Sequence, residues 1–507
     1  MGIPGLFAHL YNHVLDMTTS NLPREKVEWL MLDMNGIIHT SAQKAIFENN
    51  GKENITDIVK YIVTEIRQII LAQNNPSIRV YLAVDGVAPI AKQKQQRLRR
   101  YRSAYIREKK REIYNSYREK FPKHLEWDSN QISAGTPFMK KITDMIYLEF
   151  LDEIKTGRYI LSDSLEQGEG EHKIFEFLRK ETTKQTVVIH GLDADLILLS
   201  LLSHHDILLY RERKFFSNER ENLSQMIYLD INTLRLYLVD ELKSKTRDNP
   251  ELLIKDFIAM ASLLGNDFLP NVPTLNIYDE GIYHLLVAYK DLDMYLIEHD
   301  KNTLNMKAWE LFMNILDKNT EVRGKEQTHK TKKSKPRRFV PETTMTPKEF
   351  SLKKKIHDFE NNSEFINQVL IDFDTTDYYE KYNKEYVLDA NTLSESYFQG
   401  IYWVYLYYSQ GCPSQLYTYS SEYAPMLKDL IEKSKTYEVI PFVPTADNIS
   451  SIKKQLMYIN PKSSASVLGL SPQEVVFMQK TYPEPLSLKT QSFGHRNLHH
   501  MIIELHF

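Results

Sequence analysis

The sequence predicts an α/β fold, in which a mainly parallel sheet is flanked by helices and joined to a second, mostly helical lobe. Three short apolar runs are typical of buried strands: 28–33 (EWLMLD), 79–85 (RVYLAVD) and 186–193 (TVVIHGLD). Helical patterns such as 55–71 lie between them, and strands that alternate with helices favour a parallel sheet. Aromatic residues recur at helical spacing over 397–423, which favours packed helices in the second lobe.

Each of the three predicted strands closes in an aspartate, namely Asp33, Asp85 and Asp193. In a parallel sheet the carboxyl ends of the strands meet at one edge, and ligands collect there. A role as helix N-cap explains a single aspartate after a strand. Three of them at one edge favour a binding site.

Residues 92–120 contain neither glycine nor proline, which predicts a long exposed helix that stops near Pro122. Between 92 and 123 there are thirteen Lys or Arg against three Glu. A solvated helix face is one interpretation of this charge run, and a surface for the backbone of a nucleic acid is the other. A further helix is predicted at about 252–264, and the Gly-Asn that follows it leaves Asp267 on a loop able to reach the sheet.

Two carboxylate pairs, in GEGEH and GLDADL, have members separated by one residue, so that in extended backbone each pair projects to one side. Such charges repel one another unless cations lie between them. A pair of Mg²⁺ or Mn²⁺ ions roughly 4 Å apart takes oxygen ligands and supports phosphodiester hydrolysis. The predicted cage consists of Asp33, Asp85, Glu169, Glu171, Asp193, Asp195 and Asp267.

A second group lies on the basic helix, where Lys92, Gln96, Arg99 and Arg100 fall on one helical face. Such a face suits a terminal phosphate, because Arg offers bidentate contacts and Lys a point charge. The spacing alone is equally compatible with the solvated stripe of a basic helix.

Composition places further bounds on the chain. Its 507 residues, 42% of them hydrophobic, are enough for a large core, and the net charge of −3 is ordinary. A single cysteine, Cys412, excludes an internal disulfide framework and a cysteine-based zinc site. No apolar run approaches the ~18 residues of a spanning helix, and the start lacks the features of a signal peptide. We therefore expect a soluble intracellular protein that makes no membrane contact.

The segment 323–338 (RGKEQTHKTKKSKPRR) has eight basic residues and one acid, which predicts a disordered linker between two lobes. Its basic stretch, 330–338, also suits nuclear localisation or RNA binding. We expect a cytoplasmic protein, with the nucleus open as an alternative through this stretch.

Several long motifs resemble the XRN family of 5′→3′ exoribonucleases, in order and in spacing. They include MGIPGLF, LDMNGIIH, VDGVAPIAKQKQQRLRRYRSA, QGEGEHKI, GLDADLILL and LLGNDFLP. The resemblance is dense over 1–290 and resumes more weakly from about 345. It implies a nuclease domain of the PIN and flap-nuclease type at 1–290, a connector at 291–344, and a helical lobe at 345–507 that completes the active-site pocket.

The resemblance also implies roles for individual residues. The seven acids match the metal site of the family, and the four residues of the basic face match a pocket that reads a 5′-monophosphate. His39 and Trp403 match a pair that stacks on the first base. On the residue type alone, His39 is more often a hydrogen-bonded structural histidine.

The implied activity is processive, Mg²⁺-dependent 5′→3′ degradation of single-stranded, 5′-monophosphorylated RNA to nucleoside 5′-monophosphates by a monomer, as in mRNA decay. A flap-endonuclease-like DNA nuclease and an inactive scaffold that binds RNA 5′ ends are the alternatives. The sequence departs from the family in two respects. The first is length, because we expect a short member without the large C-terminal extension. The second is the segment QLYTYSS after residue 414, which lacks tryptophans expected there.

Overall fold

The structure is a computed structural model of the 507-residue chain. It describes residues 3, 5–14, 16–22, 27–213, 225–273, 275, 277, 280–327, 339, 341, 344–361, 389–421, 423–442, 451–482, 488–491 and 502–505. Within these ranges, no helix is both long enough and apolar enough to cross a membrane.

One sheet organises the N-terminal half, and the described strands join it in the order β1-β7-β6-β5-β2-β3-β4. The neighbours from β6 to β4 are parallel, whereas β7 pairs antiparallel with β6 and with β1. The predicted mainly parallel sheet is therefore confirmed. The strands are β1 (Thr18–Thr19), β2 (Trp29–Asp33), β3 (Arg79–Ala83), β4 (Tyr159–Ser162), β5 (Thr186–His190), β6 (Asp206–Arg213) and β7 (Gln225–Asp230).

Helices cover both faces of this sheet, which is why its central strands are apolar along their length. Side chains alternate between the faces, so Leu30 and Leu32 of β2 enter one core cluster and Trp29 and Met31 enter the other. The first cluster packs under α2 (Met34–Glu48), α3 (Ile55–Ala72) and α6 (Pro137–Glu149). The second packs under α8 (Gly170–Lys180) and α9 (Asp195–Leu201).

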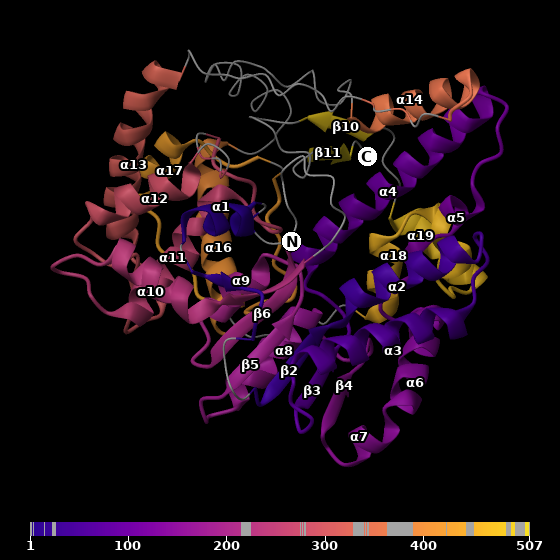
Figure 1. Ribbon diagram of the computed structural model, residues 1–507. Coiled ribbons are helices and arrows are strands. Elements are labelled where there is room, and N and C mark those ends of the chain that lie inside the picture. The colour runs from indigo at the N-terminus through magenta and orange to yellow at the C-terminus, as the bar shows by residue number, and fades with distance from the viewer. Residues whose placement is uncertain are drawn as a thin grey trace.

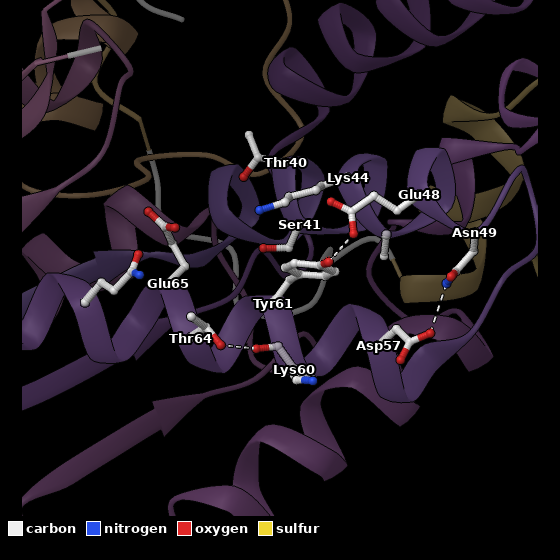
Figure 2. Close-up of a pocket in the computed structure, with 12 residues that line it drawn as sticks. Thr40, Ser41, Lys44, Glu48, Asn49, Asp57, Lys60, Tyr61, Thr64 and Glu65 are labelled. Carbon is white, nitrogen blue, oxygen red and sulfur yellow. Dashed lines mark hydrogen bonds between the residues drawn. The ribbon is translucent and has the colours of Figure 1, made fainter. Parts of the chain in front are cut away.

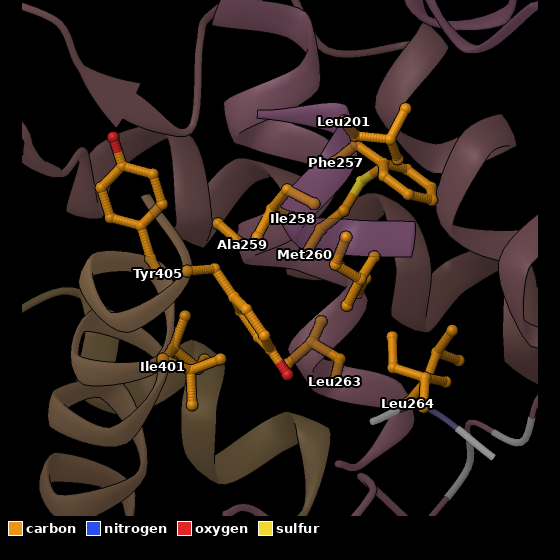
Figure 3. Packing of buried hydrophobic residues seen from close by; sticks show 14 of the residues in the cluster. Leu201, Phe257, Ile258, Ala259, Met260, Leu263, Leu264, Ile401 and Tyr405 are labelled. Atoms are coloured by element: carbon orange, nitrogen blue, oxygen red, sulfur yellow. The ribbon is translucent and has the colours of Figure 1, made fainter. Parts of the chain in front are cut away.

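The second cluster continues without a break into the helical part of the chain. It includes Met31 of the sheet, Phe257 of α11 and Tyr405 of α16, each no more than 1% exposed. Figure 3 shows α11 residues packed beside Ile401 and Tyr405 of α16. The helices of this part are α10 (Ile231–Leu242), α11 (Pro250–Ala261), α12 (Gly281–Lys290), α13 (Met306–Gln327), α16 (Ala390–Ser409) and α17 (Leu427–Ser434).

The predicted basic helix is present as α4 (Ile90–Ser116), and it ends where Arg118 takes a positive φ of 53°. The charge run predicted a helix that is exposed along its whole length, but other helices cover parts of α4. α14 (Pro347–Asn361) lies beside its far end and α18 (Ile452–Ile459) beneath it, and α18 packs on α19 (Pro472–Thr481) (Figure 1). Opposite charges meet at the first contact, where Lys110 of α4 forms an ion pair with Glu360 of α14.

The remaining described elements are short or peripheral. They are α1 (Leu6–His13), α5 (Lys123–Glu126), α7 (Leu151–Lys155), the 3₁₀ turns η1 (Ser129–Gln131), η2 (Ser262–Leu264) and η5 (Lys462–Val467), and the strands β8 (Ile297–Glu298), β9 (Thr303–Leu304), β10 (Leu488–Gln491) and β11 (Ile502–Leu505).

The predicted linker is only partly covered by the structure. Residues 323–327 continue α13 as helix, in contrast to the expected disorder, and 328–338 lie outside the described residues. The predicted division at residues 290 and 344 stays a prediction.

Candidate active site

Strand order places the predicted acids at one edge of the sheet. β2 lies between β3 and β5, and the chain passes from β2 to β3 on one side and returns to β5 on the other. Ligand sites of open α/β sheets lie at such a switch point, beyond the carboxyl ends of the strands. Asp33 is the last residue of β2, Asp85 lies two residues beyond β3, and Asp193 lies three beyond β5.

The two carboxylate pairs lie at helix starts. Glu169 is the N-cap of α8 and Glu171 is in its first turn, while Asp195 is the first residue of α9. The expectation that each pair projects from extended backbone was therefore wrong. Helix starts suit the acids better, because their unpaired N–H groups and positive dipole end stabilise negative charge.

Three of the acids are close enough to share one ion. Asp33, Asp85 and Glu171 each offer an oxygen, and these oxygens lie within 4.8 Å of one another. The backbone N–H of Gly170 donates to Asp85 over 2.7 Å. A Cβ at Gly170 would lie 3.0 Å from the Asp33 Oδ1 atom, so glycine allows this close approach.

Glu169, Asp195 and Asp267 gather around the ammonium of Lys92, which is 5% exposed. Its Nζ atom lies 2.7 Å from Glu169 and 2.9 Å from Asp267. It is also 3.8 Å from Glu171 and 4.0 Å from Asp195, so one cation contacts four carboxylates. Glu171 belongs to both groups and joins them into one cluster.

The electrostatics of the cluster indicate a deficit of positive charge. Burial raises the pKa of Asp33 well above its usual range, and the charges of Asp85 and Asp193 raise it further. Burial and the neighbouring Glu169 do the same to the pKa of Glu171. A divalent cation would relieve both effects, because it stabilises the ionised carboxylates.

Asp267 shows the opposite shift, which shows what a cation does here. Burial alone would raise the pKa of this carboxyl, but the Lys92 ammonium outweighs it and holds the pKa at about 2. Conversely, burial disfavours the charged Lys92, yet its carboxylate neighbours, led by Asp267, raise its pKa well above the usual value.

The predicted phosphate face is divided. Lys92 places its ammonium among the acids, while Arg99, further along the same helical face, is exposed. Arg100 donates to the side-chain oxygens of Asn130, over 3.2 Å, and Asn460, over 3.1 Å. Gln96 is buried, and its Oε1 atom has no hydrogen-bond partner among the described residues. The role of all four residues in phosphate binding stays a prediction.

The predicted stacking pair has one member beside this face. Burial and the charges of Arg100 and Arg99 lower the pKa of His39, on α2, to about 4, so the imidazole is neutral at pH 7. Trp403 is 0% exposed, and its ring stacks on Tyr407 at 4.6 Å. In this conformation the indole offers no open face to a base, and its predicted role stays a prediction.

Sequence reasoning missed several contacts of the acids. Asn35 donates from Nδ2 to Asp85 over 2.6 Å. Tyr407 and Tyr408 of α16 donate to Glu169 over 2.8 Å and to Asp195 over 2.5 Å. Asn35 lies in the LDMNG motif and was within reach of sequence reasoning, but the tyrosines belong to an aromatic run that is typical of core.

The described residues form two cavities of interest, and one of them borders the acids. Figure 2 shows a groove of about 540 Å³ between α2 and α3, where Lys44 and Lys60 alternate with acids such as Glu48, so its mixed charge does not favour phosphate. A larger cavity of about 960 Å³ lies between α8 and the end of α16, and it is bordered by His172 and Tyr407 beside the acids.

A parallel sheet with buried carboxylates at its switch point, beside a basic helix, defines an α/β nuclease fold. All-oxygen donors of this kind fit Mg²⁺ or Mn²⁺. Residues 1–213 match the family model of the XRN 5′-3′ exonuclease N-terminus, and 248–376 and 373–479 match that of the Xrn1 helical domain. The chain belongs to the XRN family.

Curated relatives agree with this family. The chain is 32% identical over 363 residues to 5′-3′ exoribonuclease 2 of Schizosaccharomyces pombe, and the match covers 57% of this chain and 36% of the relative. It is 34% identical over 348 residues to 5′-3′ exoribonuclease 1 of Saccharomyces cerevisiae, and this match covers 62% of the chain and 22% of the relative. The matches thus span about a third or less of these relatives.

Proposed function

We propose that this chain is a 5′→3′ exoribonuclease that removes nucleoside 5′-monophosphates, one at a time, from RNA with a 5′-monophosphate. The observation that carries the proposal is the cluster of buried and half-buried carboxylates at the switch point, next to Arg99 and Arg100 on α4. Both relatives described above are named 5′-3′ exoribonucleases, which supports the same activity.

The acids would hold two divalent ions, which supply an activated water and neutralise charge on the scissile phosphate. Asp33, Asp85 and Glu171 would hold one of them. Glu169, Asp195 and Asp267 surround Lys92 and would hold the other. No side chain needs to act as nucleophile.

The neighbouring residues of α4 would set the direction of cleavage. Arg99 is exposed at the cluster, and its charge acts on both His39 and Asp267. A terminal phosphate bound by Arg99 and Arg100 would therefore place the next phosphodiester over the acids. Lys92 begins this helical face. When a metal ion replaces its ammonium among the carboxylates, the Lys92 side chain would turn to the terminal phosphate.

The test compares RNAs of one sequence that carry a 5′-monophosphate, triphosphate, cap or hydroxyl, together with the matching DNA. With Mg²⁺ or Mn²⁺ we expect mononucleotides from the monophosphorylated RNA. Asp193→Ala and Asp195→Ala should abolish cleavage and spare RNA binding, whereas the exposed Asp144→Ala should behave as wild type. Arg99→Ala should lower the preference for monophosphate over hydroxyl by about tenfold, the value of one charged contact.

Other products would identify the alternatives. A released oligonucleotide from a flap substrate would support the structure-specific DNA nuclease. Tight binding of monophosphorylated RNA without any degradation would support the scaffold. Near-normal cleavage by Asp195→Ala would refute the role of the carboxylate cluster.

A further inference from the structure

Two consecutive tyrosines of α16 reach from the helical part of the chain into the acid cluster. The Tyr407 hydroxyl donates to the Oε1 atom of Glu169 over 2.8 Å, and the Tyr408 hydroxyl donates to the Oδ1 atom of Asp195 over 2.5 Å. Both tyrosines are buried, at 2% and 1% exposure. Water cannot easily replace these hydroxyls, so each carboxylate depends on its tyrosine for that hydrogen bond.

The two contacts share one geometry. The Oε1 atom of Glu169 accepts from Tyr407, while its Oε2 atom lies 2.7 Å from the Lys92 ammonium. The Oδ1 atom of Asp195 accepts from Tyr408, while its Oδ2 atom faces the same ammonium at 4.0 Å. In both carboxylates one oxygen is held by α16 and the other faces the centre of the cluster.

The Tyr407 ring is itself held in place by packing. The Tyr407 ring stacks on His172 of α8 with centroids 3.7 Å apart, and on Trp403 at 4.6 Å. Phe268, which follows Asp267, meets the Tyr407 ring edge-on at 5.4 Å. A ring packed from three sides cannot turn without moving its neighbours. The position of the hydroxyl is therefore set by packing between α8, α16 and the loop after η2.

We propose that Tyr407 and Tyr408 are positioning residues for the metal site, which turn Glu169 and Asp195 so that each offers a single oxygen to a divalent cation. The inference rests on the proposed function only in taking these acids as metal ligands. Residues that hydrogen-bond a metal ligand without touching the metal itself typically change metal affinity by about 10- to 100-fold. The metal site is then built jointly by the nuclease domain and the helical part.

The test removes one hydroxyl at a time. Tyr407→Phe and Tyr408→Phe keep the ring packing, and Tyr405→Phe is the matched control, because that hydroxyl on the same helix bonds Asn302 and no acid. Mn²⁺ binding without RNA is measured by calorimetry and by electron paramagnetic resonance. We expect about 10-fold or weaker binding in Tyr407→Phe and in Tyr408→Phe, and wild-type affinity in Tyr405→Phe.

Activity gives a second readout. In Tyr407→Phe and Tyr408→Phe, kcat at low Mn²⁺ should fall and recover at high Mn²⁺, while KM for RNA stays unchanged. Wild-type Mn²⁺ affinity in both variants would overturn the inference, and each variant tests it independently should the other fail to fold. If wild-type protein binds Mn²⁺ but leaves RNA intact, the proposed function fails and the positioning role stands on the binding data.

Discussion

A single lysine offsets part of the negative charge of the acid cluster. Lys92 is buried, and its ammonium contacts Glu169, Asp267 and two further carboxylates. Removing one partner of a buried ion pair leaves uncompensated charge, which typically costs about 3–5 kcal/mol. In the proposed function a divalent ion would take the place of this ammonium, so Lys92 and the ion would compete for these acids.

Replacing Lys92 by methionine should therefore have two opposite effects. Without metal, the free energy of unfolding should fall by about 3 kcal/mol, because the carboxylates lose their cation. With Mn²⁺, the metal-induced stabilisation should exceed that of wild type, because the competitor is gone. Urea unfolding in EDTA and in Mn²⁺ measures both. Lys94→Met is the control, since that ammonium bonds the Tyr419 carbonyl, and equal responses of the two variants would contradict the competition.

Titration of the acids predicts a pH dependence. In the metal-free fold, burial and neighbouring negative charges raise the pKa of Asp33 and Glu171. The folded state then binds more protons than the unfolded state above about pH 4, so stability falls as pH rises toward the folded pKa values. Metal binds the ionised form, and its stabilisation grows with pH.

The melting temperature should therefore rise more on addition of Mg²⁺ at about pH 8 than at about pH 5.5, because the acids must lose their protons to bind it. Thermal unfolding with and without Mg²⁺ at both pH values measures this difference. Asp33→Asn should reduce it. A shift in melting temperature that is independent of pH would argue against these carboxyls as ligands.

Sequence reasoning selected the seven acids because three follow apolar strands, two pairs have members one residue apart, and Asp267 follows a predicted helix. Their role as metal ligands stays a prediction. Sequence reasoning did not predict where Lys92 directs its charge. Helical spacing places Lys92, Gln96 and Arg99 on one face, but a long flexible side chain reaches several partners from one Cα. The burial of Trp403 agrees with the aromatic pattern over 397–423, which favours packed helices, whereas the resemblance implied a base-stacking role.

At the scale of elements, the turn after β3 fixes Asp85. Gly86 donates its N–H to the Gly168 carbonyl over 2.8 Å, and Gly168 donates to Val87 over 2.9 Å. These bonds join the turn to the loop that leads to Glu169. A Cβ at Gly86 would lie 1.6 Å from the Glu166 carbonyl oxygen, so any side chain there would separate the two segments.

Gly86→Ala should accordingly lower the free energy of unfolding by more than about 3 kcal/mol, a loss typical of a backbone that must move. Gly36→Ala is the control, because Gly36 lies in α2 and a Cβ there would meet no described atom within 4 Å. That change should stabilise the helix by up to about 1 kcal/mol. Chemical denaturation of the two variants compares them, and a Gly86→Ala protein as stable as wild type would contradict the contact.

The elements that were predicted correctly had strong local patterns. The helix expected at 55–71 is α3, and the helix expected at about 252–264 is α11 followed by η2. The strands at 28–33, 79–85 and 186–193 are β2, β3 and β5, although the observed strands end before Asp85 and Asp193. β4 is only four residues long, and a pattern so short cannot be separated from its surroundings.

At the scale of the whole molecule, one hydrophobic cluster links the sheet to the helical part. It contains Trp29 of β2 as well as Trp309 and Trp403 of the later helices. A shared core makes separate unfolding of the two parts costly, so we expect one cooperative transition. Tryptophan fluorescence and far-ultraviolet circular dichroism should give coincident curves. Two resolved transitions would show that the parts unfold independently.

The sequence did not predict which residues join the sheet to the helical part. The hydrogen bond between Tyr407 and Glu169 links residues 238 positions apart, and no local pattern records such a pairing. The resemblance to the XRN family led us to expect a helical lobe that completes the pocket. The particular residues that do so became visible only when the chain was folded.

The long reach of that bond also bears on how the protein is made. A ribosome synthesises the chain from the N-terminus, so every predicted metal ligand, from Asp33 to Asp267, leaves it well before Tyr407 and Tyr408. By the positioning role proposed for these tyrosines, a nascent chain would carry all of its acids and still bind metal weakly. Full metal affinity would be acquired only late in synthesis, once α16 has emerged and docked.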